Sequence, residues 1–468
     1  MDFFTWRELQ EICGGEWILP PPSASTAPAM MTDDSRLATQ NSLFVAVDGR
    51  EHGLPSDGHN YISQAANAGC SAIFAQRRPA EEVLSLLREK GCGLLLVENG
   101  LRAFQAIAHA WRKRAGIPIV GVTGSCGKTS TKEMVAAVLE NKFPNGVLKT
   151  IGNTNNYFGV PRNLLRISDE TRAAVIETGS NHPGEIHTLA EMVSPNVAVI
   201  SCIGAAHLEF FHDLNGVAEE KGDIFQSLPP DGVCVFPYTC AGKEILLRHV
   251  AGRKALTFGT EEEADIRVHY DGFRDGAFHL LLQSGTDSAE LSWAIPGECQ
   301  ALNAASAAAV GLAFGMTLKQ CAESLRKCVL PGARMAVEQR AGITWSNDAY
   351  NANPTSMLEA LKAFKDTTGD SPNNVLILGD MLELGQNSLE SHKTTLREAR
   401  NLFPQSRILT VGKFFAVAAE PYAEIQSYPD VSALLNALTL PTGTTVFLKS
   451  SHSIGLDALP SLYEKRHS

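Results

Sequence analysis

A glycine-rich segment that ends in a lysine and a threonine is the strongest chemical signal in the sequence, Thr123-Gly124-Ser125-Cys126-Gly127-Lys128-Thr129. It follows the apolar run 117–122 and precedes apolar residues at helical spacing, so we expect a strand, a loop and a helix. In that arrangement backbone N–H groups surround phosphate oxygens, Lys128 reaches the terminal phosphates and the Thr129 hydroxyl holds magnesium. The first glycine of the full Walker pattern is missing. An ordinary glycine-rich turn is the alternative, and a nucleotide phosphate site is the prediction.

Two further reactive side chains directly follow predicted strands. Glu177 ends the apolar run 173–176, and His207 follows the run 197–204. Because the carboxyl ends of parallel strands meet at one edge of a sheet, we expect both side chains near the glycine-rich loop. A hydroxyl, a carboxylate and an imidazole suit a pair of magnesium ions, although histidine is a less usual magnesium ligand. Taken singly, Glu177 is better explained as a helix cap and His207 as a structural group.

A lysine lies among acidic residues on the helix predicted after the His207 loop, in Glu219-Glu220-Lys221-Gly222-Asp223. Lysine beside glutamate is common on exposed helix faces. From these residues alone, a solvated charge cluster is the favoured interpretation of Lys221.

The elements around these motifs predict an α/β fold in three domains. Residues 1–114 form a small N-terminal α/β domain, residues 115–332 a central P-loop domain with a parallel sheet, and residues 333–468 a C-terminal Rossmann-like domain. The central domain carries added hairpins, because short alternating segments broken by Asp-Gly occupy residues 257–282. The Ala-rich stretch 301–316 is expected to be a buried helix.

Composition excludes several classes of protein. The 468 residues have a net charge of −11 with scattered basic residues, so a nucleic-acid partner is not expected. No apolar run approaches the roughly 18 residues of a membrane span. The 10 cysteines form no CxxC pair and are expected to be free thiols in a reducing compartment. Because Thr5 and Glu8 predict a capped helix where a secretory signal would start, we expect a cytoplasmic location.

Taken together, these segments resemble the Mur ligase superfamily, and specifically its members that add D-alanyl-D-alanine. The resemblance covers nearly the whole chain, and two C-terminal blocks, 348–354 (DAYNANP) and 378–385 (LGDMLELG), are the most specific. The other blocks that carry it are 123–133, 153–161, 176–186 and 204–209, with the N-terminal blocks Asp34-Ser35-Arg36, 43–46 and Asp57-Gly58-His59.

The resemblance implies an ATP- and Mg²⁺-dependent carbon–nitrogen ligase. A UDP-N-acetylmuramoyl-tripeptide carboxylate would take the γ-phosphate of ATP, and the amine of D-alanyl-D-alanine would attack the resulting acyl phosphate. The implied partners are these two substrates, with no nucleic acid, no membrane insertion and a monomeric state. Another Mur-type or folylpolyglutamate-type ligase is the alternative enzyme, and a nucleotide switch that performs no ligation is the alternative from a different class.

The resemblance also implies roles for individual residues. Lys221 would react with carbon dioxide to form a carbamate, which becomes a magnesium ligand. The implied catalytic residues are Lys128, Glu177, His207, Lys221 and Arg334. The implied metal ligands are Thr129, Glu177, His207 and the Lys221 carbamate. The implied ATP-binding residues are Thr123, Gly124, Ser125, Cys126, Gly127, Lys128, Thr129, Ser130, Asn303, Arg334, Asp348 and Asn351. The implied substrate-binding residues are Ser35, Arg36, Phe44, Asn155, Asn156, Tyr350, Lys449 and Ser451.

Several positions depart from the family's pattern. Cys126 stands where asparagine is usual, Cys299-Gln300 where histidine-asparagine is usual, and His452 where arginine is usual. The departures concern the contacts to adenine and the closure of the domains. They leave the other implied catalytic and metal-binding residues in place: Lys128, Thr129, Glu177, His207 and Lys221.

Overall fold

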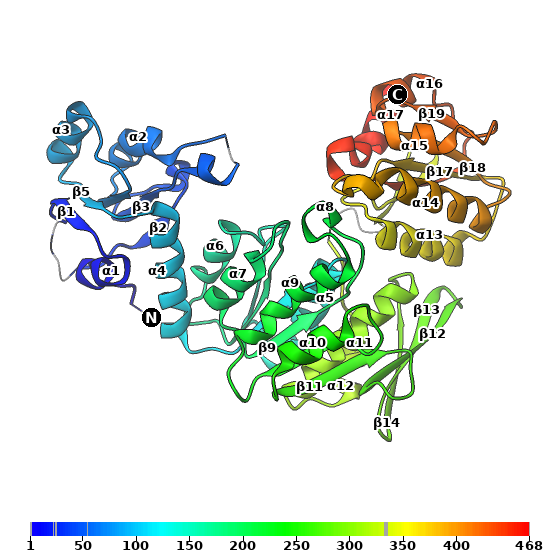
Figure 1. The fold of residues 1–468 in the computed structure, drawn as a ribbon, viewed down its shortest axis with the longest axis horizontal. Coiled ribbons are helices and arrows are strands. Elements are labelled where there is room, and N and C mark those ends of the chain that lie inside the picture. Colours follow the sequence, from blue (N-terminus) through cyan, green and yellow to red (C-terminus); the bar gives the residue numbers. More distant parts are fainter. Residues whose placement is uncertain (1, 22, 24–25, 54, 332–335, 468) are drawn as a thin grey trace. The chain divides into compact units, whose positions relative to one another are not determined.

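The computed structural model of the chain describes residues 2–21, 23, 26–53, 55–331 and 336–467. It contains three separate sheets (Figure 1). The described chain divides into two compact units. One unit comprises Met1–Ile119, Asn145–Thr178 and Thr188–Ser194, and the other comprises Val120–Pro144, Gly179–His187 and Pro195–Ser468. The three sheets confirm the predicted α/β class, while the domain boundaries at residues 114 and 332 stay a prediction.

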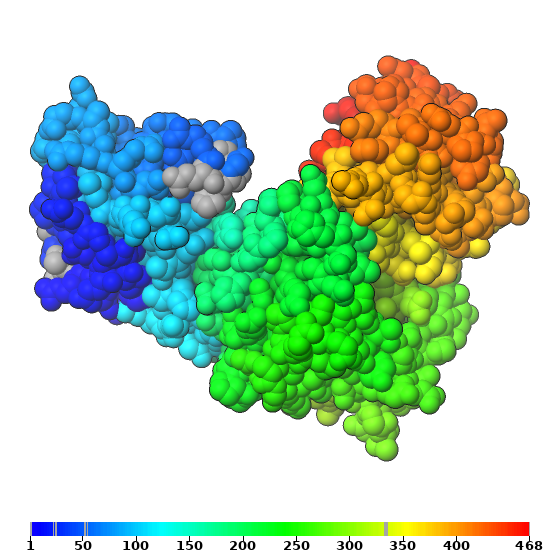
Figure 2. Space-filling view, in the orientation of Figure 1, coloured from blue at the N-terminus to red at the C-terminus, as the bar shows by residue number. Residues whose placement is uncertain are grey.

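The N-terminal sheet has five strands in the order β1-β5-β4-β3-β2. Only β1 runs antiparallel to its neighbour. The strands are β1 (Glu16–Leu19), β2 (Met30–Thr32), β3 (Ser42–Ala46), β4 (Ala72–Ala75) and β5 (Gly93–Leu96). The helices are α1 (Trp6–Cys13), α2 (Ile62–Asn67), α3 (Glu81–Lys90) and α4 (Gly100–Ala115). Thr5 and Glu8 form the predicted capping box of α1. The strands and helices of this sheet are coloured blue to cyan in Figure 2.

Helices cover both faces of this sheet, which explains why its inner strands are apolar without alternation. In β3, Leu43 and Val45 pack in one cluster with α1 and α4. Phe44 and Ala46 pack on the opposite face with α2 and α3.

The central sheet has nine strands in the order β14-β13-β12-β11-β10-β9-β6-β8-β7. Its strands are β6 (Ile119–Thr123), β7 (Val147–Lys149), β8 (Ala173–Glu177), β9 (Val197–Ile200), β10 (Val233–Pro237), β11 (Lys254–Gly259), β12 (Ile266–Arg274), β13 (Ala277–Ser284) and β14 (Asp287–Trp293). The antiparallel pair β12–β13 is a predicted hairpin at the margin of the sheet. The pair β13–β14 adds a second hairpin, whose last strand lies beyond the predicted range 257–282.

Helices α5 and α11 pack against each other beside this sheet. Helix α11 (Glu298–Ala313) is the predicted Ala-rich helix, and most of its residues are buried. The other helices are α5 (Lys128–Lys142), α6 (Gly159–Leu164), α7 (Glu185–Val193), α8 (Leu208–Phe211), α9 (Leu214–Gln226), α10 (Lys243–Val250) and α12 (Leu318–Leu325). In the part of the chain that the structure describes, no helix has the length and apolar character needed to cross a membrane.

The C-terminal sheet has six strands in the order β15-β16-β20-β17-β18-β19. Its strands are β15 (Ala336–Arg340), β16 (Ile343–Asn347), β17 (Asn374–Gly379), β18 (Arg407–Val411), β19 (Gln426–Tyr428) and β20 (Thr445–Lys449). Its helices are α13 (Pro354–Thr368), α14 (Ser388–Leu402), α15 (Lys413–Ala419), α16 (Val431–Ala437) and α17 (Leu459–His467). The first three helices pack on one face of the sheet and the last two on the other. Strands β16, β20, β17, β18 and β19 pair in parallel, as the predicted Rossmann-like domain requires, and β15 is antiparallel to β16.

Candidate functional site

The glycine-rich loop lies between β6 and α5, as the sequence predicts. Gly124 has a φ of 144°, and a Cβ atom there would lie 2.2 Å from Ser201 Oγ. Gly127 has a φ of 76°, and a Cβ atom there would lie 2.7 Å from Asn303 Oδ1. Both positions therefore require glycine, because a side chain would meet both a strained backbone and a neighbouring polar group.

Lys128 is held against this loop, since its Nζ donates to the carbonyl oxygen of Gly124 at 2.7 Å. Thr129 and Ser130 are buried in the first turn of α5. The hydroxyl of Thr123, at the end of β6, is buried and makes no hydrogen bond within the described residues. A buried polar atom without a partner beside a helix N-terminus is what a loop that receives a phosphate group would show.

Helix α11 brings Asn303 to the same loop. Asn303 Oδ1 accepts a hydrogen bond from Thr131 Oγ1 at 3.1 Å, and Asn303 Nδ2 donates to Gln300 Oε1 at 3.0 Å. The segment after β9 also fixes the loop, because Ser125 Oγ accepts a hydrogen bond from Gly204 N at 3.0 Å. These contacts place the predicted residues Ser125, Gly127 and Asn303 around one loop.

Glu177 is fully buried at the end of β8, which is the neighbour of β6 in the sheet order. Its Oε1 accepts a hydrogen bond from Asn155 Nδ2 at 2.9 Å, and its backbone N–H donates to Thr150 Oγ1 at 2.9 Å. A buried carboxylate oriented by an amide suits a metal ligand. Asn156 has a structural contact, because its Oδ1 accepts from Gly159 N at 3.0 Å at the start of α6.

His207 has the left-handed conformation, with φ 52°, and precedes α8. Its Nδ1 lies 2.6 Å from Glu383 Oε2. The two atoms are close, but within the described residues Nδ1 has no aligned hydrogen bond. The contact with His207 holds the pKa of Glu383 below its ordinary value. Glu383 also has a positive φ, of 62°. His207 and Glu383 thus both have a strained backbone and lie in contact. Backbone strain costs stability, and proteins often retain that cost at functional positions.

The interpretation of Lys221 as a solvated charge is wrong. Lys221 is 1% exposed, and its Nζ donates to Ser180 Oγ at 2.5 Å and lies 5.5 Å from the centroid of the Phe211 ring. Burial, followed by the positive charge of Lys128, lowers the pKa of Lys221 to about 7. The neighbouring Glu220 is buried as well. Its carboxylate accepts hydrogen bonds from Gly184 N and Ile186 N near the start of α7.

The C-terminal domain gathers another group of predicted residues at the ends of β16 and β20. Lys449 is 4% exposed, and its Nζ lies 2.5 Å from Asp348 Oδ2 and donates to the Asn351 carbonyl oxygen at 3.0 Å. The rings of Tyr350 and His452 lie 5.5 Å apart. Ser451 Oγ accepts a hydrogen bond from Leu382 N at 3.0 Å, which joins this group to the 378–385 block.

A cavity of about 500 Å³ lies beside α8, α13 and α14. Its lining includes Leu208, which follows His207, and the carboxylates Glu359, Glu390 and Glu398. The acidic lining suits a cationic group more than a phosphate.

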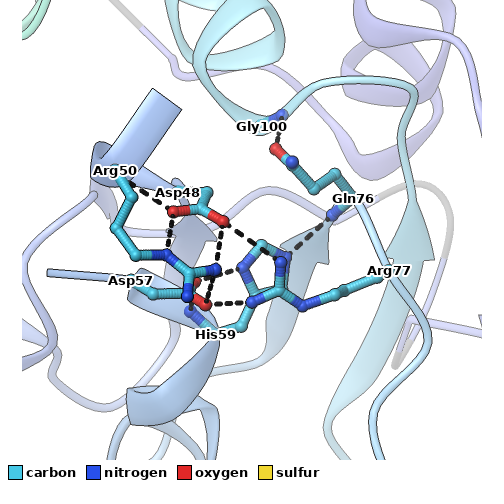
Figure 3. A network of polar contacts seen from close by, with 7 residues as sticks. All are labelled: Asp48, Arg50, Asp57, His59, Gln76, Arg77 and Gly100. Atoms are coloured by element: carbon cyan, nitrogen blue, oxygen red, sulfur yellow. Dashed lines mark hydrogen bonds and ion pairs between the residues drawn. The ribbon is translucent and has the colours of Figure 1, made fainter. Parts of the chain in front are cut away.

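The N-terminal block that includes Asp57 and His59 forms a network in which exposed arginines pair with buried carboxylates (Figure 3). Asp57 and Asp48 are 3% and 5% exposed, and both are paired with Arg50 and Arg77. His59 Nδ1 lies 2.8 Å from Asp57 Oδ1, and His59 Nε2 accepts a hydrogen bond from the backbone N–H of Gln76 at 3.1 Å. Because Nε2 accepts, the ring is neutral and Nδ1 donates. Asp57 and His59 thus have structural roles in this network.

The neutral state of His59 gives a testable pH dependence. Burial lowers the pKa of His59 despite the hydrogen bond to Asp57. As pH falls, His59 is therefore protonated in the unfolded chain before it is protonated in the folded chain. The neutral ring stabilises the folded state above about pH 6.5, and this stabilisation is lost as pH falls through the pKa of His59 in the folded chain. We expect faster amide exchange of the Gln76 N–H at pH 5.5 than chemical exchange alone predicts. In His59→Asn this extra pH dependence should vanish, and an unchanged pH profile would show that another group titrates.

The predicted substrate residues of the N-terminal domain separate into two kinds. Phe44 is 1% exposed and packs in the core, so this placement does not support contact between its side chain and a substrate. Arg36 is largely exposed and is bound through two nitrogens to Asp34, and Ser35 Oγ donates to Gln64 Oε1 at 3.1 Å. Arg36 therefore offers a positioned cation at the surface.

Some predicted residues cannot be placed together. Arg334 lies outside the described residues. Within the described ranges, no group of three or more histidine, cysteine, aspartate and glutamate residues is arranged to hold a metal ion. The predicted set contains only two residues of these types, Glu177 and His207, and needs oxygen atoms from Thr129, a carbamate and phosphates. The shared metal site stays a prediction.

Three important contacts were missed from the sequence. Ser180 contacts Lys221 and Glu383 contacts His207, and Glu220 accepts hydrogen bonds from the backbone at Gly184 and Ile186. Ser180 and Glu383 lie within or between the blocks that carry the family resemblance, which is the signal that would have found them. Glu220 was hidden in the acidic run beside Lys221.

A glycine-rich loop between a parallel strand and a helix, in a chain with three α/β sheets, is the architecture of an ATP-dependent ligase of the α/β class. The model of the Mur ligase middle domain matches residues 122–311, and that of the Mur ligase, glutamate ligase domain matches residues 333–452. The chain belongs to the Mur ligase family, among its UDP-N-acetylmuramoyl-tripeptide–D-alanyl-D-alanine ligases.

Similar proteins match over almost their full length. The UDP-N-acetylmuramoyl-tripeptide–D-alanyl-D-alanine ligase of Bacillus subtilis is 30% identical, with 97% of each chain covered. The ligase of the same name from Escherichia coli is 31% identical, with 97% of this chain and 96% of the other covered. A crystal structure of MurF from Acinetobacter baumannii superposes with a TM-score of 0.88 at 27% identity, with 99% of each chain covered.

Proposed function

We propose that this chain joins D-alanyl-D-alanine to UDP-N-acetylmuramoyl-tripeptide at the expense of ATP. The observation that carries the proposal is the 30–31% identity to ligases of that name over 97% of this chain. The constrained glycine loop with Lys128 supports the use of ATP, and the preserved blocks 348–354 and 378–385 support the choice of acceptor. The product would be the UDP-muramoyl-pentapeptide precursor of peptidoglycan.

The residues of the site suit phosphoryl transfer that needs alignment and charge neutralisation and no protein nucleophile. Lys128 would leave the Gly124 carbonyl oxygen and donate to the terminal phosphates. The loop amides between Gly124 and Gly127 would hold the β-phosphate. The tripeptide carboxylate attacks the γ-phosphorus and ADP leaves; the amine then attacks the acyl carbon and phosphate leaves. The predicted interdomain contact of Arg334 with the phosphates is part of this proposal.

The residues present fit a magnesium ion. Thr129 in the first turn of α5 and the buried, amide-oriented carboxylate of Glu177 are oxygen donors, which Mg²⁺ prefers. When bound, the ion would neutralise phosphate charge during transfer. His207 is part of the same proposed set, with Glu383 restraining its ring.

We further propose that Lys221 carries the carbamate. A neutral amine is the form that reacts with carbon dioxide, giving a carbamate and releasing one proton, and a pKa of about 7 leaves much of this amine neutral near pH 7. The reaction would replace a buried cation near Lys128 with an anion. Ser180 Oγ, at 2.5 Å from Nζ, is placed to orient the product.

A cytoplasmic location and a monomeric state belong to the same proposal. All 10 cysteines are free thiols, which supports a reducing compartment. Gel filtration with light scattering would measure the oligomeric state directly.

A substrate panel tests the proposed reaction. We expect phosphate release with ATP, Mg²⁺ and UDP-muramoyl-tripeptide to depend on D-alanyl-D-alanine, with at least about a hundredfold lower rate for D-alanine or glutamate, because each lacks groups that the acceptor site pairs. The tripeptide should be supplied with lysine and with diaminopimelate in parallel. Phosphate release that is equal for all acceptors would indicate a nucleotide switch, and a preference for glutamate would indicate a folylpolyglutamate-type ligase.

A further inference from the structure

A buried histidine of α14 binds the loop of residues 380–383, which follows β17. His392 is 0% exposed, and its Nε2 accepts a hydrogen bond from the backbone N–H of Met381 at 2.9 Å. Its Nδ1 lies 2.5 Å from the Ser388 carbonyl oxygen. Because Nε2 accepts, the ring is neutral and Nδ1 donates its proton to that carbonyl oxygen. Both ring nitrogens are thus used in hydrogen bonds.

The loop is held at three consecutive residues. Ser451 N donates to the Asp380 carbonyl oxygen at 3.1 Å, and Leu382 N donates to Ser451 Oγ at 3.0 Å. Between these two contacts, Met381 N donates to His392. A serine hydroxyl does not titrate near neutral pH, whereas an imidazole does. The contact with His392 is therefore the one whose strength depends on the binding of a proton.

The next residue connects this loop to the candidate site. Glu383 has a φ of 62°, and its Oε2 lies 2.6 Å from His207 Nδ1. A Cβ atom at Gly385 would lie 3.2 Å from Glu209 Cα, so the chain after the loop also lies against the segment that carries His207. A displacement of the loop at Met381 would therefore move the carboxylate that contacts His207.

The surroundings of His392 favour the neutral ring. Burial lowers the pKa of His392, so the ring gains a proton only below about pH 6.5. Asp380 Oδ1 lies 3.6 Å from His392 Nε2, but its carboxylate already accepts hydrogen bonds from Phe414 N and Phe415 N at the start of α15. The elements around the ring also carry charged residues that are exposed, Lys413 on α15 and Glu390 and Lys393 on α14.

A second proton would disrupt this arrangement. On Nε2 it would point at the Met381 N–H, so two donors would face each other. The ring is confined on two sides, because its centroid lies 5.3 Å from that of Phe414 and 4.6 Å from that of Phe415. The Met381 N–H would then lose its acceptor in a buried place, and the loop would shift to find another.

We propose that His392 is a positioning residue for the ligation reaction, because its neutral ring holds the 380–383 loop and, through Glu383, orients His207. Protonation of the ring releases the loop and lowers the turnover. His392 acts through Met381 and Glu383 and is not a catalytic residue. This inference rests on the proposed function, in which His207 belongs to the site of phosphoryl transfer.

The test compares the turnover of wild type with that of His392→Gln between about pH 8 and about pH 5. A glutamine oxygen can accept from Met381 N but does not bind a proton in this range. The ratio of wild-type to variant turnover cancels the groups that titrate in both proteins, Lys221 among them. We expect this ratio to be constant above about pH 7 and to fall at lower pH toward a limit about tenfold lower.

NMR spectroscopy of the full chain supplies a measurement that does not depend on activity. With ¹⁵N-labelled histidine, the ring of His392 should be neutral at about pH 8, with the proton on Nδ1. The midpoint of its titration should equal the midpoint of the turnover ratio. Over the same pH range, exchange of the Met381 N–H should become faster than chemical exchange alone predicts. Affinity for ATP, measured by equilibrium dialysis, should show no matching change, because Lys128 and the glycine-rich loop lie in the central domain.

Variants separate positioning from a contribution to stability alone. His392→Leu keeps the apolar volume and removes the acceptor, so its turnover at about pH 8 should be about tenfold lower, and His392→Gln should restore most of that loss. In a Glu383→Ala background, His392→Leu should cost less than about twofold more, because both residues act through the same contact. His269→Gln is the matched control, since His269 is 65% exposed on β12, and it should keep the wild-type pH profile. If His392→Leu does not fold, the glutamine variant and the NMR titration decide.

The proposal is overturned if the turnover ratio stays constant down to about pH 5, or if its midpoint differs from that of the His392 ring. It is also overturned if the losses of His392→Leu and Glu383→Ala multiply. Wild type without phosphate release that depends on D-alanyl-D-alanine would instead contradict the proposed function. The titration of His392 and the exchange of Met381 would still be measurable in that case, so the two failures are distinct.

Discussion

Lys128→Ala is expected to lower ADP formation in the presence of both substrates by on the order of a thousandfold. In the structure Lys128 Nζ donates to the Gly124 carbonyl oxygen, so the ammonium group already lies at the loop that would bind the phosphates. Its loss removes a positive charge from the point where negative charge accumulates during phosphoryl transfer. Because that charge is needed most in the transition state, kcat should fall much more than the affinity for ATP.

The matched control for this prediction is Lys142→Ala, since Lys142 lies at the other end of the same helix, α5. Its Nζ contacts the Phe314 carbonyl oxygen at the surface, so its loss should leave turnover within about twofold of wild type. ADP formation would be measured by a coupled assay at saturating tripeptide and D-alanyl-D-alanine. Undiminished turnover of Lys128→Ala would remove the nucleotide site from this loop.

The glycine loop was predictable because its requirements are local. Strand β6, the loop and α5 are consecutive in the chain. Gly124 and Gly127 have positive φ values, which glycine adopts without strain, so the residue types themselves indicate the loop conformation. The three sheets were predictable for a related reason, since strands buried on both faces read as apolar runs separated by amphipathic helices. Short edge strands such as β19 (Gln426–Tyr428) bury little and leave no such pattern.

The surroundings of a residue were predicted wrongly where they are formed by distant parts of the chain. Lys221 lies in an acidic run that looks solvated, yet Ser180, 41 residues away, and the ring of Phe211 bury its amine. Phe44 lies in a block that resembles the family's nucleotide segment, yet its side chain faces the sheet core. Local composition does not determine which side of an element faces another part of the chain. The family resemblance, which carries that information, corrected the first case and not the second.

The proposed metal ligands fall between these two cases. Glu177 and His207 were predicted from their positions after strands; Glu177 is the last residue of β8, whereas His207 lies seven residues after the end of β9 and directly before α8. What the sequence could not supply is the group that orients each one, Asn155 for Glu177 and Glu383 for His207. These partners are 22 and 176 residues away from the residues that they orient, and their choice depends on how loops fold over the sheet.

Lys221→Ala is expected to reduce ligase activity by about a hundredfold or more while leaving the fold intact. The substitution removes the amine that would carry the carbamate, so an anion proposed to bind magnesium is lost from a buried position. A small carboxylate such as acetate fits the space that the side chain leaves and supplies the missing charge. We therefore expect acetate to restore part of the activity of Lys221→Ala in a concentration-dependent way. Wild type should lose activity in buffers stripped of carbon dioxide and recover it with bicarbonate.

Two controls decide whether the carbamate or the buried lysine itself is responsible. Glu219→Ala alters the exposed residue two positions earlier on α9 and should respond to neither acetate nor bicarbonate. Lys221→Arg keeps a positive charge that cannot form the carbamate, and it should be as inactive as the alanine variant and indifferent to bicarbonate. An arginine variant with wild-type turnover would mean that the site needs a cation at this position. In that case the positive charge of Lys221 would act on the phosphates beside Lys128. Another group would have to supply the anionic ligand of the proposed magnesium site.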